Sequence, residues 1–193
     1  MVENYLAAYG IKIFVSLIIF ITLIVMFTRQ SNERTNNDPQ GVKNVLSQLE
    51  SDYEVLTNVM VPGDRGMFDL GYVVVSPYGV FVITVKQTIG KIFGRKGDRE
   101  WEVKSGGSRD FIENPLWENR KHVNALEKLI GPAPFISIVV FPRGNLKGEF
   151  GANVIRLGEL KNFIAQNTTF NMSMDKRDGI LKTLQKSQPK IRG

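Results

Sequence analysis

The sequence contains no cysteine and only one histidine, His122. The absence of cysteine excludes disulfide bonds, thiolate metal sites and cysteine nucleophiles, and it suits a reducing compartment. One imidazole cannot build a histidine-rich zinc site, and it argues against a serine–histidine triad. Glycine-rich phosphate-binding and dinucleotide-binding motifs are also missing after the apolar runs, so nucleotide sites of those types are excluded.

What the sequence does contain is typical of a globular protein with a modest excess of basic residues. Hydrophobic residues make up 42% and charged residues 23% of the 193 positions. The net charge of +6 and the pI near 9.5 favour phosphate or anionic-lipid partners, although many proteins without such partners are equally basic. The length suffices for one ordinary domain and an anchor.

A long apolar run near the N-terminus predicts a membrane anchor. Residues 13–27 contain no charged residue, glycine or proline, and extending the run back to Leu6 gives 22 residues. A helix of that length spans the roughly 30 Å hydrocarbon core of a bilayer. A cleaved signal peptide fits poorly, because the first residues, MVEN, contain an acid and no basic residue, and no small-residue cleavage site follows Phe27. We therefore expect a short segment at 1–10 and a single transmembrane helix at 11–28.

The flanking charges predict the orientation of this anchor. Arg29, Arg34 and Lys43 follow the apolar run, whereas Lys12 alone precedes it. The positive-inside rule then places the C-terminal domain in the cytoplasm, in a single-pass membrane protein. The polar residues 29–40 are typical of a linker.

The rest of the chain predicts an α/β domain at 41–166 and a basic, helical tail at 167–193. Asn114 and Pro115 form a helix start and Gly131 a helix stop. The apolar periodicity predicts helices at 42–49, 115–130, 158–166 and 176–186, and strands at 53–61, 68–75, 79–85, 89–94, 100–104 and 135–141. This order implies a mixed β-sheet flanked by helices.

Several short motifs in this domain resemble one known family. The run VVVSPYGVFVI at 73–83 is followed at fixed spacing by Lys86, by glycines at 90 and 94, and by an Asn-Pro-Leu segment at 114–116. Together with Asn119 and His122, this pattern resembles the nuclease-related domain (NERD) family from about Gly41 to Leu160. The resemblance implies the PD-(D/E)xK nuclease-like fold, but a fold alone does not imply activity.

The acidic residues that the resemblance leads us to expect are missing. The resemblance implies a nuclease design in which two carboxylates hold one or two Mg²⁺ ions, and the three places where the family has acids are occupied in this chain by Val42, Gly71 and Thr84. The lysine of the family's Glu-x-Lys motif remains as Lys86. Without hard oxygen ligands a divalent ion is not retained. We therefore expect no cofactor and a catalytically inactive, nuclease-related domain.

An alternative hypothesis is a rebuilt metal site. Asp69 lies two residues before Gly71, on the same strand face by the period-2 rule, and a bulge near Gly71 would shift it towards the old position. Glu118 stands where the family has glutamine. With Lys86, these two carboxylates would define a divergent, Mg²⁺-dependent deoxyribonuclease. In the simpler interpretation, both are ordinary surface acids.

Basic residues of one turn are candidates for binding. Arg95, Lys96 and Arg99 lie between Phe93 and Trp101, a combination that grips nucleic acid by charge and stacking, or else forms an exposed hairpin tip with inward-facing aromatics. The turn and the basic tail together are also compatible with binding anionic lipid. His122, four residues after Glu118 on the same helix face, is either a packing residue or part of the old site.

These observations predict a membrane-anchored, inactive NERD domain that serves as a cytoplasmic binding module. Its predicted partners are membrane lipid, through the N-terminal helix, and either a protein or a nucleic acid, through the NERD-like domain. The alternative is the divergent nuclease that uses Asp69, Glu118 and Lys86.

Overall fold

The computed structural model describes residues 39–64 and 66–188. The predicted anchor at 11–28 and the segment 1–10 lie outside these residues, as do most residues of the predicted linker. Within the described part of the chain, no helix is both long enough and apolar enough to cross a membrane.

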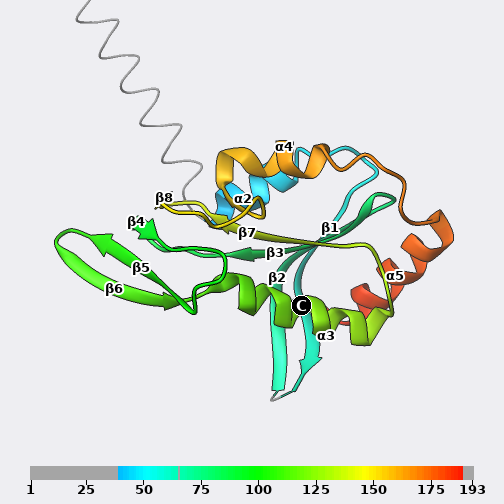
Figure 1. Cartoon of the computed structure of the whole chain (residues 1–193). Helices are drawn as coiled ribbons and strands as arrows, with labels where there is room; N and C mark the ends of the chain where they lie inside the picture. The colour runs from blue at the N-terminus through cyan, green and yellow to red at the C-terminus, as the bar shows by residue number, and fades with distance from the viewer. Residues whose placement is uncertain (1–38, 65, 189–193) are drawn as a thin grey trace, which may run out of the picture. The chain divides into compact units, whose positions relative to one another are not determined.

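A mixed five-stranded sheet forms the centre of the domain (Figure 1). The first three strands pair in antiparallel fashion, and the last three strands pair in parallel. In spatial order the strands are β1 (Glu54–Gly63), β2 (Gly66–Ser76), β3 (Gly79–Val85), β7 (Phe135–Phe141) and β9 (Val154–Arg156). The predicted mixed sheet is therefore confirmed.

Helices cover both faces of this sheet (Figure 1). On one face, α3 (Pro115–Ile130) and α5 (Met174–Lys186) bury Leu126 and Leu184 against β1, β2 and β3. On the other face, α2 (Pro39–Leu46) and α4 (Leu160–Ala165), which follows the 3₁₀ turn η1 (Leu157–Glu159), pack their own apolar residues. Because the central strands are covered twice, nearly every residue of β3 is buried, as its continuous apolar run predicts.

The turn between β2 and β3 requires a glycine. Gly79 has a φ of 156°, and a Cβ added to it would lie 2.6 Å from the carbonyl oxygen of Pro134. The Ser76 hydroxyl lies 3.3 Å from the Gly79 carbonyl oxygen and closes the turn. This tight connection fixes the register of the two strands, in which Tyr72 pairs with Ile83.

The ends of α3 follow from the capping residues seen in the sequence. The Asn114 side chain accepts a hydrogen bond of 3.0 Å from the amide of Leu116, and Pro115 occupies the first turn. At the other end, Gly131 has a φ of 78° and donates its amide to the carbonyl of Glu127. The predicted bounds of this helix are confirmed.

A second, four-stranded sheet was not predicted. Its order is β6 (Ser108–Glu113), β5 (Glu100–Ser105), β4 (Gly90–Phe93) and β8 (Gly144–Leu146). The prediction included β4 and β5 but missed β6, β8 and β9. The sequence of β6 is polar and mostly exposed, while β8 and β9 have only three residues each, so none of the three shows an apolar period.

The second sheet packs one face on the end of the first. Ile92, Trp101 and Val103 from that face form a core cluster with Val139 and Phe141 of β7. Trp101 is fully buried and lies 4.5 Å, between ring centroids, from Phe150. None of the helices in the described residues lies on the opposite face of this sheet, in contrast to the covered faces of the first sheet (Figure 1).

The C-terminal segment contributes to the main core. Ile180, Leu181 and Leu184 of α5 are buried in the same cluster as β1 and β2. The residues predicted as a tail thus include a helix whose apolar face is part of the domain interior.

We expect the Leu184→Ala substitution to lower the free energy of unfolding by about 2–5 kcal/mol, because it empties a fully buried position. The exposed neighbour Lys182 provides the control, and Lys182→Ala should change stability by less than about 0.5 kcal/mol. Urea unfolding of the full chain in detergent measures both. Equal stability of the two variants would mean that α5 is not packed in solution.

Candidate functional site

The end of β3 presents two polar side chains towards α3. Val80 and Val82 point into the core beneath α3, so the period of the strand directs Thr84 and Lys86 to the same side. Thr84 is buried, and Lys86 follows the last strand residue and is half-exposed. This edge is where the family's Glu-x-Lys motif lies in the sequence.

One fully buried amide joins α3 to this edge of the sheet. The Asn119 side-chain nitrogen lies 2.8 Å from the carbonyl oxygen of Val82, 3.1 Å from that of Ile138 and 3.0 Å from the hydroxyl of Thr84. The Asn119 side-chain oxygen accepts a hydrogen bond from the hydroxyl of Ser137. Every polar atom of Asn119 is therefore used to hold α3 against β3 and β7.

Lys86 forms an ion pair with Glu118, the residue before Asn119 on α3. The two side chains are 29% and 43% exposed, so water screens the pair and its contribution to stability is small. The Glu118 carboxylate nevertheless lies beside the positive charge of Lys86, the lysine that this chain shares with the family's Glu-x-Lys motif.

His122 completes this group of side chains on α3. Its Nδ1 lies 3.4 Å from the Thr84 hydroxyl, and its ring packs against Phe68 at 5.4 Å between centroids. Burial lowers the pKa of His122 below 6.5. The carboxylates of Glu118 and Asp69 oppose this shift, and the ammonium groups of Lys86 and Lys121 add to it. The imidazole is accordingly neutral at pH 7.

Gly71 faces open space beside Thr84. The β2–β3 register ends with the pair of Tyr72 and Ile83, so Gly71 and Thr84 are the next residues of their strands. No atom lies within 4 Å of a Cβ added to Gly71. The family's second acidic position is thus next to its third, but here neither carries a carboxylate.

Asp69 lies on a different face of β2 from the one that the period-2 rule predicts. Phe68 and Leu70 pack in the same cluster as Val73, so the alternation along β2 shifts by one residue between 70 and 73. The exposed Asp69, which lies between Phe68 and Leu70, faces away from that cluster. On the opposite strand, Asn58 has a positive φ of 54° at the level of this shift.

Val42 is remote from this group. It is fully buried and packs with α4 against the sheet face opposite to Thr84. Among the described residues, no three or more His, Asp and Glu side chains are placed to hold a metal ion. The structure therefore brings Lys86, Glu118, Thr84 and His122 together, with Gly71 beside them, but not Val42.

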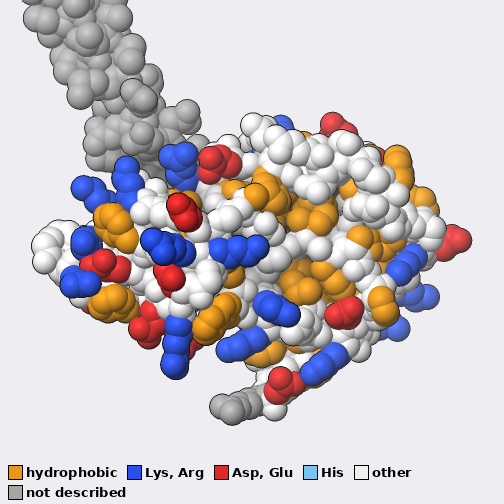
Figure 2. Space-filling model, in the orientation of Figure 1, with side chains coloured by type: hydrophobic (Ala, Val, Ile, Leu, Met, Phe, Trp, Pro, Cys, Tyr) orange, Lys and Arg blue, Asp and Glu red, His pale blue; other side chains and the backbone are white. Residues whose placement is uncertain are grey.

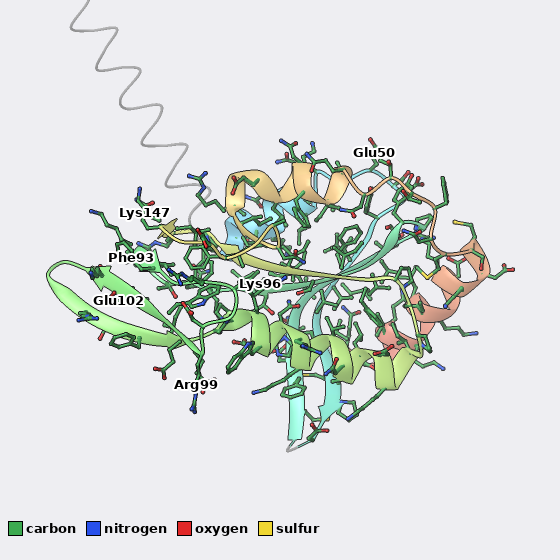
Figure 3. The ribbon with its side chains drawn as sticks, in the orientation of Figure 1. Glu50, Phe93, Lys96, Arg99, Glu102 and Lys147 are labelled. Carbon is green, nitrogen blue, oxygen red and sulfur yellow. The ribbon has the colours of Figure 1, made fainter. Side chains whose placement is uncertain are left out.

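The basic turn is held rigidly, and its tryptophan is inaccessible. The Asn114 side chain donates hydrogen bonds of 3.0 and 2.7 Å to the carbonyls of Lys96 and Asp98, and the Trp101 indole donates one of 3.0 Å to the carbonyl of Arg95. Trp101 cannot stack on a base because it is buried. The exposed Arg99 points outward in Figure 3.

Lys96 also lines a cavity of about 550 Å³ beside α3. Trp117, Arg120 and Phe150 contribute to its wall. This cavity is mainly apolar with two cations at its rim, and it lies along the face of α3 that is turned from Glu118.

Comparisons with known proteins agree with this geometry. The model of the nuclease-related domain family matches residues 37–142. An uncharacterized protein of Bacillus anthracis is 30% identical over 151 residues, which cover 74% of this chain and 71% of the relative. No solved structure matches. The chain belongs to the nuclease-related domain (NERD) family.

Two polar residues of the site were not assigned a role from the sequence. Asn119 was noted only as part of the family pattern, and Ser137 was not noted at all. The signal for Ser137 is a polar residue within an otherwise apolar stretch, FISIVVF at 135–141, whereas Asn119 lies among polar and charged residues and carries no such signal. Such residues are usually hydrogen-bonded when buried, but the identity of the partner depends on tertiary structure.

We expect Asn119→Ala to reduce the free energy of unfolding by about 1–3 kcal/mol or more, because it leaves buried carbonyls without a donor. Asn124→Ala, at an exposed position of the same helix, is the matched control and should be nearly neutral. Chemical denaturation monitored by circular dichroism measures both. A neutral Asn119→Ala would show that the amide does not hold α3 in place.

The single imidazole allows a direct pH test by NMR. We expect His122 to titrate below 6.5, Glu118→Gln to lower its pKa further, and Lys86→Met to raise it. A lowered pKa in the folded state means that the unfolded chain binds a proton at His122 more tightly than the folded chain does. The contribution of His122 to the free energy of unfolding is therefore fully present above pH 6.5 and is lost as the pH falls from there through the folded-state pKa. Glu127→Gln, on the same helix, should leave the titration unchanged. A wild-type pKa above 6.5 would contradict the burial of His122.

Proposed function

We propose that this chain is a membrane-tethered NERD protein whose domain binds a partner in the cytoplasm and does not cleave nucleic acid. The family and the mixed sheet with helices on both faces support a PD-(D/E)xK-type framework. The apolar run at 13–27 and the basic residues after it support the tether and its orientation.

The hydrogen-bonding state of Thr84 carries the proposal. In the family's motif this position supplies a carboxylate to the metal. Here its hydroxyl is buried and lies within reach of Asn119 and His122. A neutral hydroxyl with internal partners, beside a glycine at 71, does not fit a divalent ion, which needs several anionic or carbonyl oxygens aimed at one point.

The state of Lys86 supports the same conclusion. A lysine that assists phosphate chemistry needs its charge directed at the phosphate. In this protein Glu118 neutralises that charge, and a phosphate would have to compete with the carboxylate.

The same ion pair is the one observation that favours a second function. It brings a carboxylate to the family's lysine, as a rebuilt nuclease site would require. Such a site needs a second carboxylate. Asp69 is close enough for its charge to act on His122, but it is exposed and its neighbours Phe68 and Leu70, not Asp69 itself, face the apolar cluster beneath α3. We therefore rank the divergent Mg²⁺-dependent nuclease second.

A cleavage assay separates these functions. We expect the full chain, purified in mild detergent, to leave plasmid and single-stranded DNA intact with 10 mM Mg²⁺ or Mn²⁺, and Mn²⁺ not to raise its melting temperature. Agarose electrophoresis and a thermal-shift series measure the two properties.

Variants identify any activity that does appear. Cleavage that Asp69→Asn and Glu118→Gln both abolish would establish the second function and overturn the first. Cleavage that both variants retain would be assigned to a contaminating nuclease. The control is Asp110→Asn, which removes an exposed carboxylate of the second sheet, away from Lys86, and should leave any cleavage unchanged.

A further inference from the structure

The open face of the second sheet carries an ordered pattern of side chains. Ile92, Trp101 and Val103 point inward from β4 and β5, so the residues between them point outward. Basic side chains gather over this sheet at the left of Figure 2, with hydrophobic side chains between them.

The strand register aligns three cations across this face. Lys91 of β4 pairs with Lys104 of β5, and Lys104 pairs with Arg109 of β6. On the far side of β4, Lys91 pairs with Asn145 of β8. We call Lys91, Lys104 and Arg109 the basic row.

A second row of residues lies beside the first, two residues along each strand. Phe93 of β4 pairs with Glu102 of β5, which pairs with Phe111 of β6. Figure 3 shows Lys147, Phe93 and Glu102 following one another across β8, β4 and β5. We call Phe93, Glu102 and Phe111 the aromatic row. The two rows are separated by about 6.8 Å, which is two residues of strand rise.

The phenylalanines are held in place at the surface by cations. The Lys104 ammonium lies 4.8 Å from the centre of the Phe93 ring, and the Arg109 guanidinium lies 5.4 Å from that of Phe111. Glu102 forms ion pairs with both cations: its Oε1 lies 2.6 Å from Arg109 Nε and 3.3 Å from Lys104 Nζ, which restrains both stems. Phe111 is 57% exposed, although a ring of this size is normally buried.

Further positive charge surrounds the basic row. Arg143 and Lys91 line a shallow cavity of about 700 Å³, and Lys147 follows β8. In the described part of the chain, none of these three residues forms an ion pair. At the opposite end of the sheet, beyond the aromatic row, Glu100 pairs with Glu113. The face is therefore polarised along its strands.

We propose that this face binds single-stranded nucleic acid. Phosphates along the basic row would draw Lys104 and Arg109 away from the rings of Phe93 and Phe111, and bases would stack on the ring faces that these cations cover in the free protein. Exposed aromatic rings beside a line of cations are what an unpaired strand requires, because each base offers a π-face and each nucleotide a charge. The carboxylates of Glu100 and Glu113 repel phosphates from the other end, so the strand crosses the sheet with its backbone on the Lys91 side.

Two other anionic partners fit the pattern less well. In a duplex, the bases are stacked on one another and cannot reach rings that lie on a flat sheet. A lipid surface favours side chains that protrude into it, whereas Phe93 is half-buried beneath Lys104. The surface is separate from Lys86 and Glu118, so strand binding does not depend on whether that site cleaves DNA.

The test uses the full chain in neutral detergent and a fluorescent 12-nucleotide oligo(dT), with binding followed by anisotropy. We expect Phe111→Ala and Phe93→Ala to weaken binding at least fivefold each, and Phe111→Trp to retain affinity. The slope of log K against log salt should be about −2 for three phosphates, and Lys91→Gln should reduce it by about 0.7. Phe170→Ala and Lys161→Gln, at exposed positions elsewhere in the domain, should change neither property.

Three results would overturn the proposal. They are the absence of oligonucleotide binding, equal binding by the row variants and the control variants, and tighter binding of a duplex than of the single strand. A parallel measurement uses a fluorescent short-chain phosphatidylserine as the probe. If this lipid binds, the row variants abolish its binding and the oligonucleotide does not bind, the face is a lipid-binding surface. None of these variants changes a residue of the Lys86 site. Differences in affinity between them therefore report on the face of the second sheet, whether or not the Lys86 site cleaves DNA.

Discussion

The buried amide of Asn119 determines how the rest of the site is arranged. It connects α3 to the carbonyls of β3 and β7 and to the Thr84 hydroxyl, and Ser137 saturates its oxygen. Because the helix is held at this point, Glu118 reaches Lys86 and His122 reaches Thr84. An amide without a partner at this depth would be costly, so the helix has one favourable position on the sheet.

This arrangement also determines what the site is able to do. Carboxylates at positions 71 and 84 would repel one another and would need a cation to compensate their charge. In this chain, Thr84 and Asn119 satisfy one another, while Glu118 compensates the remaining lysine. The polar groups at the end of β3 thus have partners within the protein, as is usual for polar groups that are buried.

The two sheets differ in how much of their surface is covered by other elements of the described chain. The first sheet is buried on both faces by helices, and Val42 lies in one of those layers. The second sheet is covered on one face by the packing of Trp101 against Phe150, so its outer face meets solvent with Phe111 exposed. The aligned cations therefore lie on a flat face, whereas Lys86 lies at the end of β3 and is paired with Glu118.

Local chemistry was enough to predict much of the first sheet. Apolar runs, the glycine turn at 79 and the caps at 114 and 131 act within a few residues, so β3, β7 and α3 were found with their bounds. The loss of family carboxylates at 71 and 84 was equally visible along the chain. The alternation shift that turns Asp69 away, the pairing of β4 with β8 and the burial of Trp101 arise from contacts between distant segments. Only the folded chain brings those segments together, and it alone decides which face of β5 remains open.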